Sequence, residues 1–438
     1  MCINVLDANF GYYTGGVKVT DNLKAFIFRE GAGEIKNKYL ADPKGYYLRH
    51  KNVKKEWVPV YAQTSDHTAK VVGTPLKEFY NDALKFVAAQ ISLQSYYSFD
   101  VIGFTNDVYD FEAEALGAKL VYSDNVMPSI DARDPLIKKP SDLSKLKTPD
   151  FLRDGRFPYQ LEIFRKKKEM GINQGTFCGP LSLAVALRSY QLLINDLIED
   201  PAFVKDLMHF IIDQITMPYI KAVNKYLGIT EFRGSDATAT LPLFSPAMLE
   251  DVILPWNLAI IKKGLDMGVN SFVFCPGLYG EELPEQFDYS IMSRCYDFSL
   301  ASLGESNVLL RIGRHPDYPL DPFLKYALDL KSRYPKGPVE VAIRVYPRLL
   351  RDGPIEKIIH YIKNMLDTFC PGFQVSVYLT DVSVDTPPEH IHAAVQSTHY
   401  YGKLPYKFID DDASFQPKKR ESYSDFIDSM KNEENKYV

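Results

Sequence analysis

Short β-rich runs alternate with long amphipathic runs from about residue 75 onward, and this alternation restricts the fold more than any other feature of the sequence. In the first amphipathic run, apolar residues recur at positions 76, 79, 80, 83, 84 and 87, the spacing of one helical face. Such repetition predicts parallel strands that are covered by helices on their outer side. The β-rich runs lie at residues 101–104, 171–177, 230–234, 271–274, 307–311, 339–344 and 374–379.

A closed barrel and an open, doubly wound sheet both fit this alternation. The glycine-rich turns of dinucleotide and P-loop folds, G-x-G-x-x-G and G-x-x-x-x-G-K-[ST], are absent, which weakens the open-sheet alternative. We therefore predict an α/β protein with a (β/α)8 TIM barrel over residues 75–405. Residues 1–74 lack a clear periodicity and predict an irregular N-terminal arm packed on the barrel. Residues 406–438 predict a polar C-terminal tail.

Two helices are predicted after the second β-rich run, at about residues 181–195 and 201–226. Pro201 suits the first position of the second helix, because proline lacks the N–H that a first-turn residue leaves unbonded. Asp200 precedes it and is a favourable N-cap.

Composition limits the kind of partner that the chain can have. The net charge of −5 in 438 residues argues against nucleic acid, whose phosphates require a basic face. No apolar run has the length of a membrane span, and the first residues lack the pattern of a signal peptide. The five cysteines are scattered and odd in number, which argues against a disulfide framework and favours a cytoplasmic protein.

Polar residues at the ends of the predicted strands are the candidate site. In a (β/α)8 barrel, catalytic groups lie at the carboxyl ends of the strands. Each residue alone also has a structural interpretation: an aspartate can cap the helix that follows, a cysteine can be a small buried hydrophobe, and a buried arginine needs a carboxylate partner. Their number at one rim nevertheless predicts a site there. The predicted rim residues are Asn106, Asp107, Cys178, Asp236, Cys275, Arg311, Arg344 and Asp381.

The histidines form no H-E-x-x-H pattern, and no C-x-x-C or G-x-S-x-G motif is present. His315 lies in a loop after a predicted strand, where it is well placed to face a substrate. The aromatic content of 13% suits an apolar pocket, although core packing is the simpler explanation.

Four ordered segments share one pattern of motifs: residues 99–104 with 112–118, 179–184 with 200–201, 235–247 with 254–256, and 386–391. They resemble the uroporphyrinogen decarboxylase superfamily, and together they cover about residues 75–400. The resemblance implies a (β/α)8 barrel and one of two chemistries. One branch decarboxylates uroporphyrinogen without a cofactor. The other moves a methyl group between a corrinoid and a small molecule, usually with zinc as the activating metal.

Departures from the family patterns favour the methyltransferase branch. The arginine signature that clamps propionate groups in the decarboxylase is missing from residues 1–74. The coenzyme M methyltransferases carry His-x-Cys after the fifth strand unit and a second Cys on the last strand. Cys275 matches the first cysteine, whereas Val273 stands at the histidine position, and Thr380 and Asp381 stand near the second cysteine position.

The resemblance therefore implies a methyltransferase that takes a methyl group from a small donor, for example a methoxylated aromatic, and passes it to a corrinoid on a separate partner protein. A metal or a proton donor must neutralise the leaving oxygen. A cofactor-free decarboxylase and a non-catalytic binding barrel are the alternatives. We predict catalytic roles for Asp236, Asp381 and Arg344, and a zinc ligand at Cys275. The predicted substrate-binding residues are Asn106, Asp107, Cys178, Tyr279, Arg311 and His315.

Overall fold

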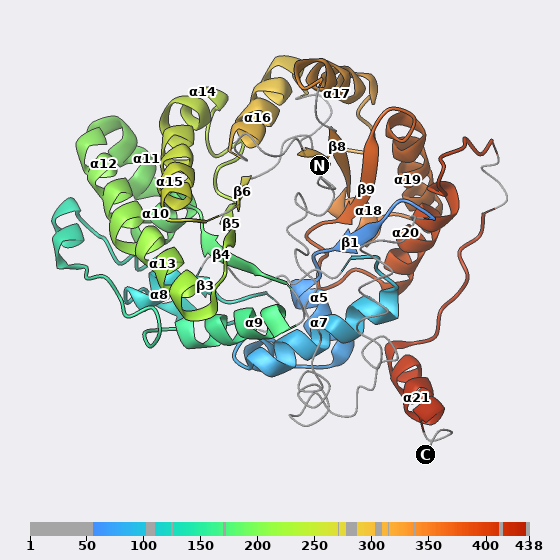
Figure 1. The fold of residues 1–438 in the computed structure, drawn as a ribbon, viewed down its shortest axis with the longest axis horizontal. Coiled ribbons are helices and arrows are strands. Elements are labelled where there is room, and N and C mark those ends of the chain that lie inside the picture. Colours follow the sequence, from blue (N-terminus) through green and yellow to red (C-terminus); the bar gives the residue numbers. More distant parts are fainter. Residues whose placement is uncertain are drawn as a thin grey trace.

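The computed structural model describes residues 56–101, 110–123, 126–169, 172–269, 271–276, 287–302, 309–313, 315–335, 339–410 and 415–434, with the backbone alone at 271–276 and 430–434. Strands lie in the middle of the molecule and helices surround them (Figure 1). This arrangement confirms the predicted (β/α)8 barrel class.

The described strands of the barrel form two parallel groups. One has the order β1-β9-β8-β7 and the other β4-β5-β6. Parallel strands that follow one another around a ring bring their carboxyl ends to one rim. The strands are β1 (Val60–Ala62), β4 (Gln174–Cys178), β5 (Glu231–Asp236), β6 (Ser271–Pro276), β7 (Leu309–Ile312), β8 (Glu340–Val345) and β9 (Gln374–Leu379).

The helices follow the strands on the outer side. A short antiparallel pair, β2 (Leu120–Val121) and β3 (Ser129–Ile130), and a 3-10 turn, η1 (Pro140–Lys145), lie between α8 and α9. The remaining elements, including the π-helical turns η2 and η3, are α5 (Ser65–Val72), α6 (Leu76–Phe79), α7 (Ala83–Tyr97), α8 (Phe111–Ala115), α9 (Phe157–Glu169), α10 (Pro180–Arg188), α11 (Tyr190–Glu199), α12 (Pro201–Phe210), η2 (Ile211–Thr216), α13 (Met217–Leu227), α14 (Pro246–Met248), η3 (Leu249–Ile253), α15 (Leu254–Asp266), α16 (Tyr289–Ala301), α17 (Asp321–Arg333), α18 (Pro347–Asp352), α19 (Ile355–Phe369), α20 (Pro388–Tyr401) and α21 (Tyr423–Glu434).

Successive side chains of β7, β8, β9 and β1 point alternately to an outer face and to an inner face of the barrel. Leu310, Ile343 and Val377 belong to the apolar core that these strands share with α17, α19 and α20. Because successive side chains of a strand point to opposite faces, Arg311 and Arg344 lie on the inner face of the barrel. The sequence pattern therefore buries aliphatic side chains against the helices and leaves polar ones inside.

A second core lies behind β4 and β5. Phe177 and Phe232 pack there with side chains of α9, α10, α12 and α13. The helix predicted at 201–226 is confirmed as a continuous run of α12, η2 and α13, and Asp200 accepts a hydrogen bond from the N–H of Phe203 at 3.0 Å. The helix predicted at 181–195 is wrong as one piece, because Ser189 has φ 68° and α10 and α11 meet at 104°.

Two predicted domain limits differ from the structure. The prediction began the barrel at residue 75, whereas β1 already pairs with β9 in the barrel sheet, so part of the predicted arm is a barrel strand. Residues 1–55 lie outside the described residues, as does most of the strand predicted at 101–104. The predicted polar tail contains α21, whose Phe426 is buried in the core of the β7–β8–β9–β1 group.

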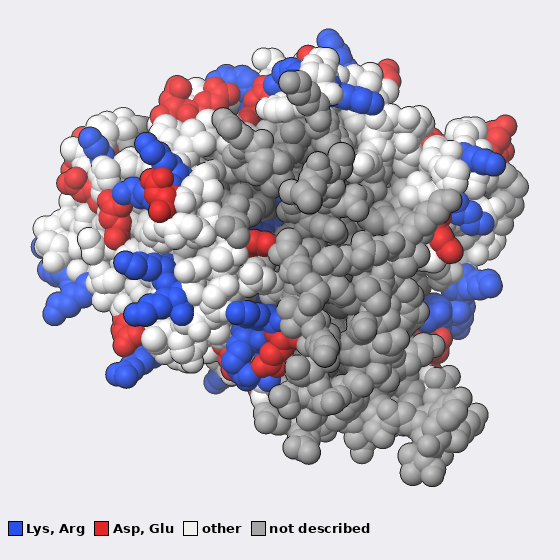
Figure 2. Space-filling view, viewed as in Figure 1, with Lys and Arg blue, Asp and Glu red and all other residues white. Residues whose placement is uncertain are grey.

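No single described helix is long and apolar enough to cross a membrane. Only the bent pair α10 and α11 passes that test, by combined length and composition. On the face shown in Figure 2, Lys and Arg side chains are interspersed with Asp and Glu over the helices on the left, without a continuous basic stripe in the part drawn white, blue and red.

Candidate functional site

A group of buried acidic side chains surrounds the carboxyl end of β4. Glu112, in the first turn of α8, is 1% exposed, and its Oε1 accepts a hydrogen bond from the N–H of Cys178 at 2.9 Å. Asp110, which immediately precedes α8, is also buried. Cys178 is the last residue of β4 and is fully buried. The short helix thus carries two carboxyl groups to the rim of the barrel.

Burial changes the protonation of these groups. Desolvation raises the pKa of Glu112 from 4.5 to about 7, and the neighbouring charge of Asp110 adds to this rise. Desolvation likewise raises the pKa of Asp110 to about 7, against the lowering effect of the Arg156 charge. Burial and the charges of Glu112, Asp236 and Asp110 raise the pKa of the Cys178 thiol well above its ordinary value. Near neutral pH, the site therefore holds a protonated thiol and carboxyl groups that readily gain or lose a proton.

Asp236 ends β5 and is fully buried. Its Oδ1 accepts hydrogen bonds from the N–H and the Oγ of Ser182, both at 2.8 Å, in the first turn of α10. Desolvation raises the pKa of Asp236 to about 6 although the bonds from Ser182 lower it. A Cβ atom on Gly179 would lie 2.4 Å from the Cβ of Asp236, so only glycine leaves room for this approach. Asp236 therefore supports the start of α10.

The sequence-based alternative for Asp236 was a cap on the helix that follows it. That alternative is wrong, because Ser245 caps α14 by accepting a hydrogen bond from the N–H of Met248. The helix that Asp236 supports lies before it in the chain. Its contact forms only when β4 and β5 are paired.

Arg344 and Asp381 meet at the ends of β8 and β9. The Arg344 Nη2 donates to Asp381 Oδ2 and to Thr380 Oγ1, both at 3.2 Å. This confirms that the buried arginine has a carboxylate partner. Asp381 has φ 48°, in the left-handed region that aspartate tolerates better than most residues, and its side chain is 58% exposed. Asp381 therefore orients Arg344 from the solvent side of the rim.

Other inner-face residues of this half are aromatic or basic. Tyr61 of β1 and Tyr378 of β9 are register partners, and their rings stack with centroids 4.6 Å apart. Arg344 pairs in register with Tyr378, and Arg311 with Ala342, so Arg311 lies deeper in the barrel than Arg344. The His315 ring lies 5.1 Å from the Tyr346 ring.

The predicted site residues divide into three groups. Asn106, Asp107 and Tyr279 lie outside the described residues, and Cys275 lies opposite Ser235 in the β5–β6 pairing with only its backbone described. Cys178 and Asp236 lie together among the carboxyl side chains around the end of β4. Four other predicted residues lie at β7–β9: Arg311, Arg344, Asp381 and His315. The single cluster of Asp107, Asp236, Cys275 and Asp381 stays a prediction.

The sequence analysis missed Asp110 and Glu112 as site residues. Both follow the predicted strand at 101–104, and a barrel places its functional groups after its strands. The sequence analysis named Glu112 only within a segment that resembles the family. Within the described ranges, no group of three or more His, Cys, Asp or Glu residues fits a metal ion. The side chain of Cys275 lies outside this search, so zinc at Cys275 stays a prediction.

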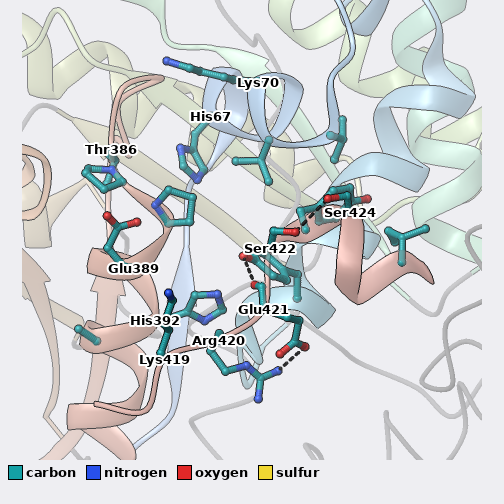
Figure 3. Close-up of a pocket in the computed structure, with 18 of the residues that line it drawn as sticks. His67, Lys70, Thr386, Glu389, His392, Lys419, Arg420, Glu421, Ser422 and Ser424 are labelled. Carbon is teal, nitrogen blue, oxygen red and sulfur yellow. Dashed lines mark hydrogen bonds and ion pairs between the residues drawn. The ribbon is translucent and has the colours of Figure 1, made fainter. Parts of the chain in front are cut away.

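A groove of about 1120 Å³ lies between α5, the start of α20 and the C-terminal segment (Figure 3). His67 and His392 line it, and burial lowers the pKa of each to about 4, so both are neutral near pH 7. Lys70 at its edge pairs with Asp385 at 2.8 Å. None of the predicted site residues lines this groove.

Comparisons with known proteins agree with the observed fold. The profile of the family described as uroporphyrinogen decarboxylase (URO-D) matches residues 47–288, which is more than half of the chain. A methyltransferase from Methanosarcina mazei is 18% identical, with 82% of this chain and 98% of that chain covered and a TM-score of 0.60, and it shares the fold. The carboxyl transferase domain of Rhizobium etli pyruvate carboxylase is 10% identical over 78% of this chain and 64% of that chain. Its TM-score of 0.26 is too low to support an argument. No curated protein matches the sequence.

Proposed function

This chain belongs to the uroporphyrinogen decarboxylase family, and on that premise we propose that it is an enzyme of the methyltransferase type. It takes a methyl group from a small donor, for example a methoxylated aromatic, and passes it to a corrinoid on a partner protein. The corrinoid supplies the nucleophile that accepts the methyl group. The residues of this chain bind the donor and protonate its leaving oxygen.

The observation that carries this proposal is the state of Glu112. Its Oε1 is held by the N–H of Cys178, whereas its Oε2 is buried and has no hydrogen-bond partner in the described part of the chain. A carboxyl group with a pKa of about 7 is an efficient general acid near neutral pH. Glu112 is therefore equipped to give up a proton at the barrel rim.

The proposed step requires that proton. When the bond between the methyl carbon and the ether oxygen breaks, the electron pair stays on the oxygen, and an uncompensated phenolate is a poor leaving group. Glu112 Oε2 donates its proton to that oxygen, and the product leaves as a neutral phenol. The buried surroundings strengthen this hydrogen bond by excluding water. Solvent returns the proton to Glu112 after release.

Other predicted residues take supporting roles in the proposal. Asp236 holds the start of α10 against β5 and keeps a second raised-pKa carboxyl group near Cys178. Arg344, oriented by Asp381, contributes positive charge on the opposite side of the rim. The catalytic roles predicted from the sequence for Asp236, Asp381 and Arg344 stay predictions.

A cofactor-free decarboxylase is the second candidate. The observation in its favour is that Arg311 and Arg344 are buried on the inner face, and arginine binds carboxylates well. A carboxylated substrate suits both reactions. Decarboxylation would proceed without any corrinoid.

One assay separates these candidates. The enzyme is mixed with a reduced corrinoid protein and methoxylated aromatic compounds, and methylcobalamin formation is followed by absorbance from pH 5 to 9. Methyl transfer that requires the corrinoid protein, with a rate falling above about pH 7 as Glu112 loses its proton, supports the proposal. Carbon dioxide release without corrinoid supports the decarboxylase. Binding without turnover in either assay contradicts both enzyme functions.

A further inference from the structure

Arg311 is a buried guanidinium without a partner among the residues that the structure describes. It is 9% exposed, and no hydrogen bond or ion pair engages its side chain within the part of the chain that the structure describes. Other buried arginines of the chain are paired: Arg188 binds both carboxylate oxygens of Asp196, and Arg344 binds Asp381. Because arginine keeps its charge at all ordinary pH values, burying it without an anion opposes folding.

The position of Arg311 explains why the chain retains a buried charge that opposes folding. It lies on the inner face of β7, opposite Ala342 of β8, and Arg344 is two residues farther toward the rim. From strand geometry, the two arginine Cα atoms are roughly 8 Å apart. Tyr378, the register partner of Arg344, stacks on Tyr61 beside them. Two cations and an aromatic pair thus share one wall of the barrel interior, with the buried Glu340 on the same face of β8, two residues before Ala342.

We propose that Arg311 binds the carboxylate of an aromatic substrate, with Arg344 on its rim side and Tyr61 and Tyr378 beside the ring. The planar guanidinium matches a carboxylate with two parallel hydrogen bonds, and the anion supplies the partner that Arg311 lacks among the described residues. This inference specifies the methyl donor of the proposed function. A donor held by its carboxylate at β7 extends across the barrel toward the acidic groups around β4.

The test measures binding and does not depend on turnover. Calorimetric titration compares 4-methoxybenzoate with 4-methoxybenzamide, which keeps the ring and the ether but lacks the charge. The wild-type protein is expected to bind the benzoate at least about tenfold more tightly, because hydrogen bonds to charged groups discriminate by about 10- to 100-fold. Arg311→Gln is expected to remove this preference and leave the benzamide affinity unchanged. Arg311→Lys is expected to give an intermediate preference, because lysine lacks the planar fork.

Two controls separate binding from folding. Arg348→Gln changes an exposed arginine of α18 and is expected to leave both affinities unchanged. Arg311→Gln removes an unpaired buried charge, so its melting temperature should equal or exceed that of the wild-type protein. A melting temperature several degrees lower would indicate an internal partner for Arg311 and overturn the inference.

The outcomes for this inference and for the proposed function are distinct. Equal wild-type affinity for the benzoate and the benzamide, no binding of either, or a benzoate preference that survives Arg311→Gln contradicts the inference. Arg311-dependent benzoate binding without methyl transfer supports the inference and contradicts the proposed function.

Discussion

The two groups of barrel strands handle buried charge in opposite ways. Around the ends of β4 and β5, burial raises the pKa of Asp110 and Glu112 to about 7 and that of Asp236 to about 6, so these carboxyl groups take up a proton at higher pH than exposed ones. On β7 and β8, the buried side chains are the guanidinium groups of Arg311 and Arg344. A carboxyl group can answer desolvation by taking a proton, whereas a guanidinium needs an anion. One wall is therefore suited to proton transfer and the other to anion binding.

The largest expected effect concerns the carboxyl groups around the ends of β4 and β5. Glu112→Gln keeps the acceptor for the N–H of Cys178 but removes the acidic proton. We expect kcat for methyl transfer to fall by at least about 100-fold, the low end for loss of a general acid. The decline of the wild-type rate near pH 7 should also disappear. Steady-state kinetics across pH on a confirmed donor measure both, with Glu199→Gln, an exposed change on α11, as the control. A normal rate in Glu112→Gln excludes it as the acid.

The second effect concerns stability against pH. The pKa of Glu112 is higher in the folded state than its ordinary value of 4.5, so folding favours the protonated form. Its stabilising contribution is complete below about pH 4.5 and is lost as the pH rises through about 7. At about 1.4 kcal/mol per pH unit, this amounts to about 3 kcal/mol.

Glu112→Gln removes that dependence. At pH 8 the variant should therefore be more stable than the wild-type protein by up to about 3 kcal/mol, even though it is less active. Urea denaturation at pH 5 and pH 8 measures the difference. Loss of stability at pH 8 would mean that the ionised carboxylate is stabilised by its surroundings, which is the reverse of our explanation.

A smaller effect separates the structural carboxyl group from the functional one. Asp236→Ala removes the acceptor for Ser182 at the start of α10 and should lower the free energy of unfolding by about 1 to 2 kcal/mol, as for a lost helix cap. Asp236→Asn retains the acceptor and should lose less. Denaturation curves of the two variants at pH 7 make the comparison, and equal losses would contradict the capping role.

The smallest expected effect concerns Asp381, the partner of Arg344 at the ends of β8 and β9. The sequence hypothesis gives Asp381 a catalytic role, with about a 100-fold loss on replacement. In the structure its side chain is 58% exposed, and ion pairs with an exposed partner contribute at most about 1 kcal/mol. We therefore expect Asp381→Asn to change KM by less than about fivefold and to leave kcat unchanged. A fall in kcat of about 100-fold would restore the sequence hypothesis.

Strand positions were predictable because each strand is a local pattern. The strand predicted at 374–379 is confirmed as Gln374–Leu379, and the positions of Cys178, Asp236 and Arg344 at strand ends follow from the same pattern. Glu112 was not predictable in this way. Its helix has five residues, and its partner, the N–H of Cys178, is 66 positions away in the chain. The raised pKa depends on burial that only the assembled barrel creates.

The division of polar residues between the two walls also required the structure. Both Asp236 and Asp381 follow strands, so the sequence treats them alike. Asp236 is buried beneath α10, whereas Asp381 faces solvent in a left-handed conformation. Which helix end reaches each aspartate depends on packing between segments that are distant in the chain.

The pairing of β1 with β9 has a consequence for synthesis. Val60 of β1 lies opposite Val377 of β9, so the ribosome must complete almost the whole barrel before this seam can close. The C-terminal segment then crosses it: the Tyr96 hydroxyl of α7 bonds the Glu421 carbonyl, and Gln396 of α20 bonds the Lys418 backbone. Until β9 emerges, β1 presents an unpaired edge to neighbouring nascent chains. We therefore expect the yield of correctly folded protein to depend on how soon β9 follows β1 during synthesis.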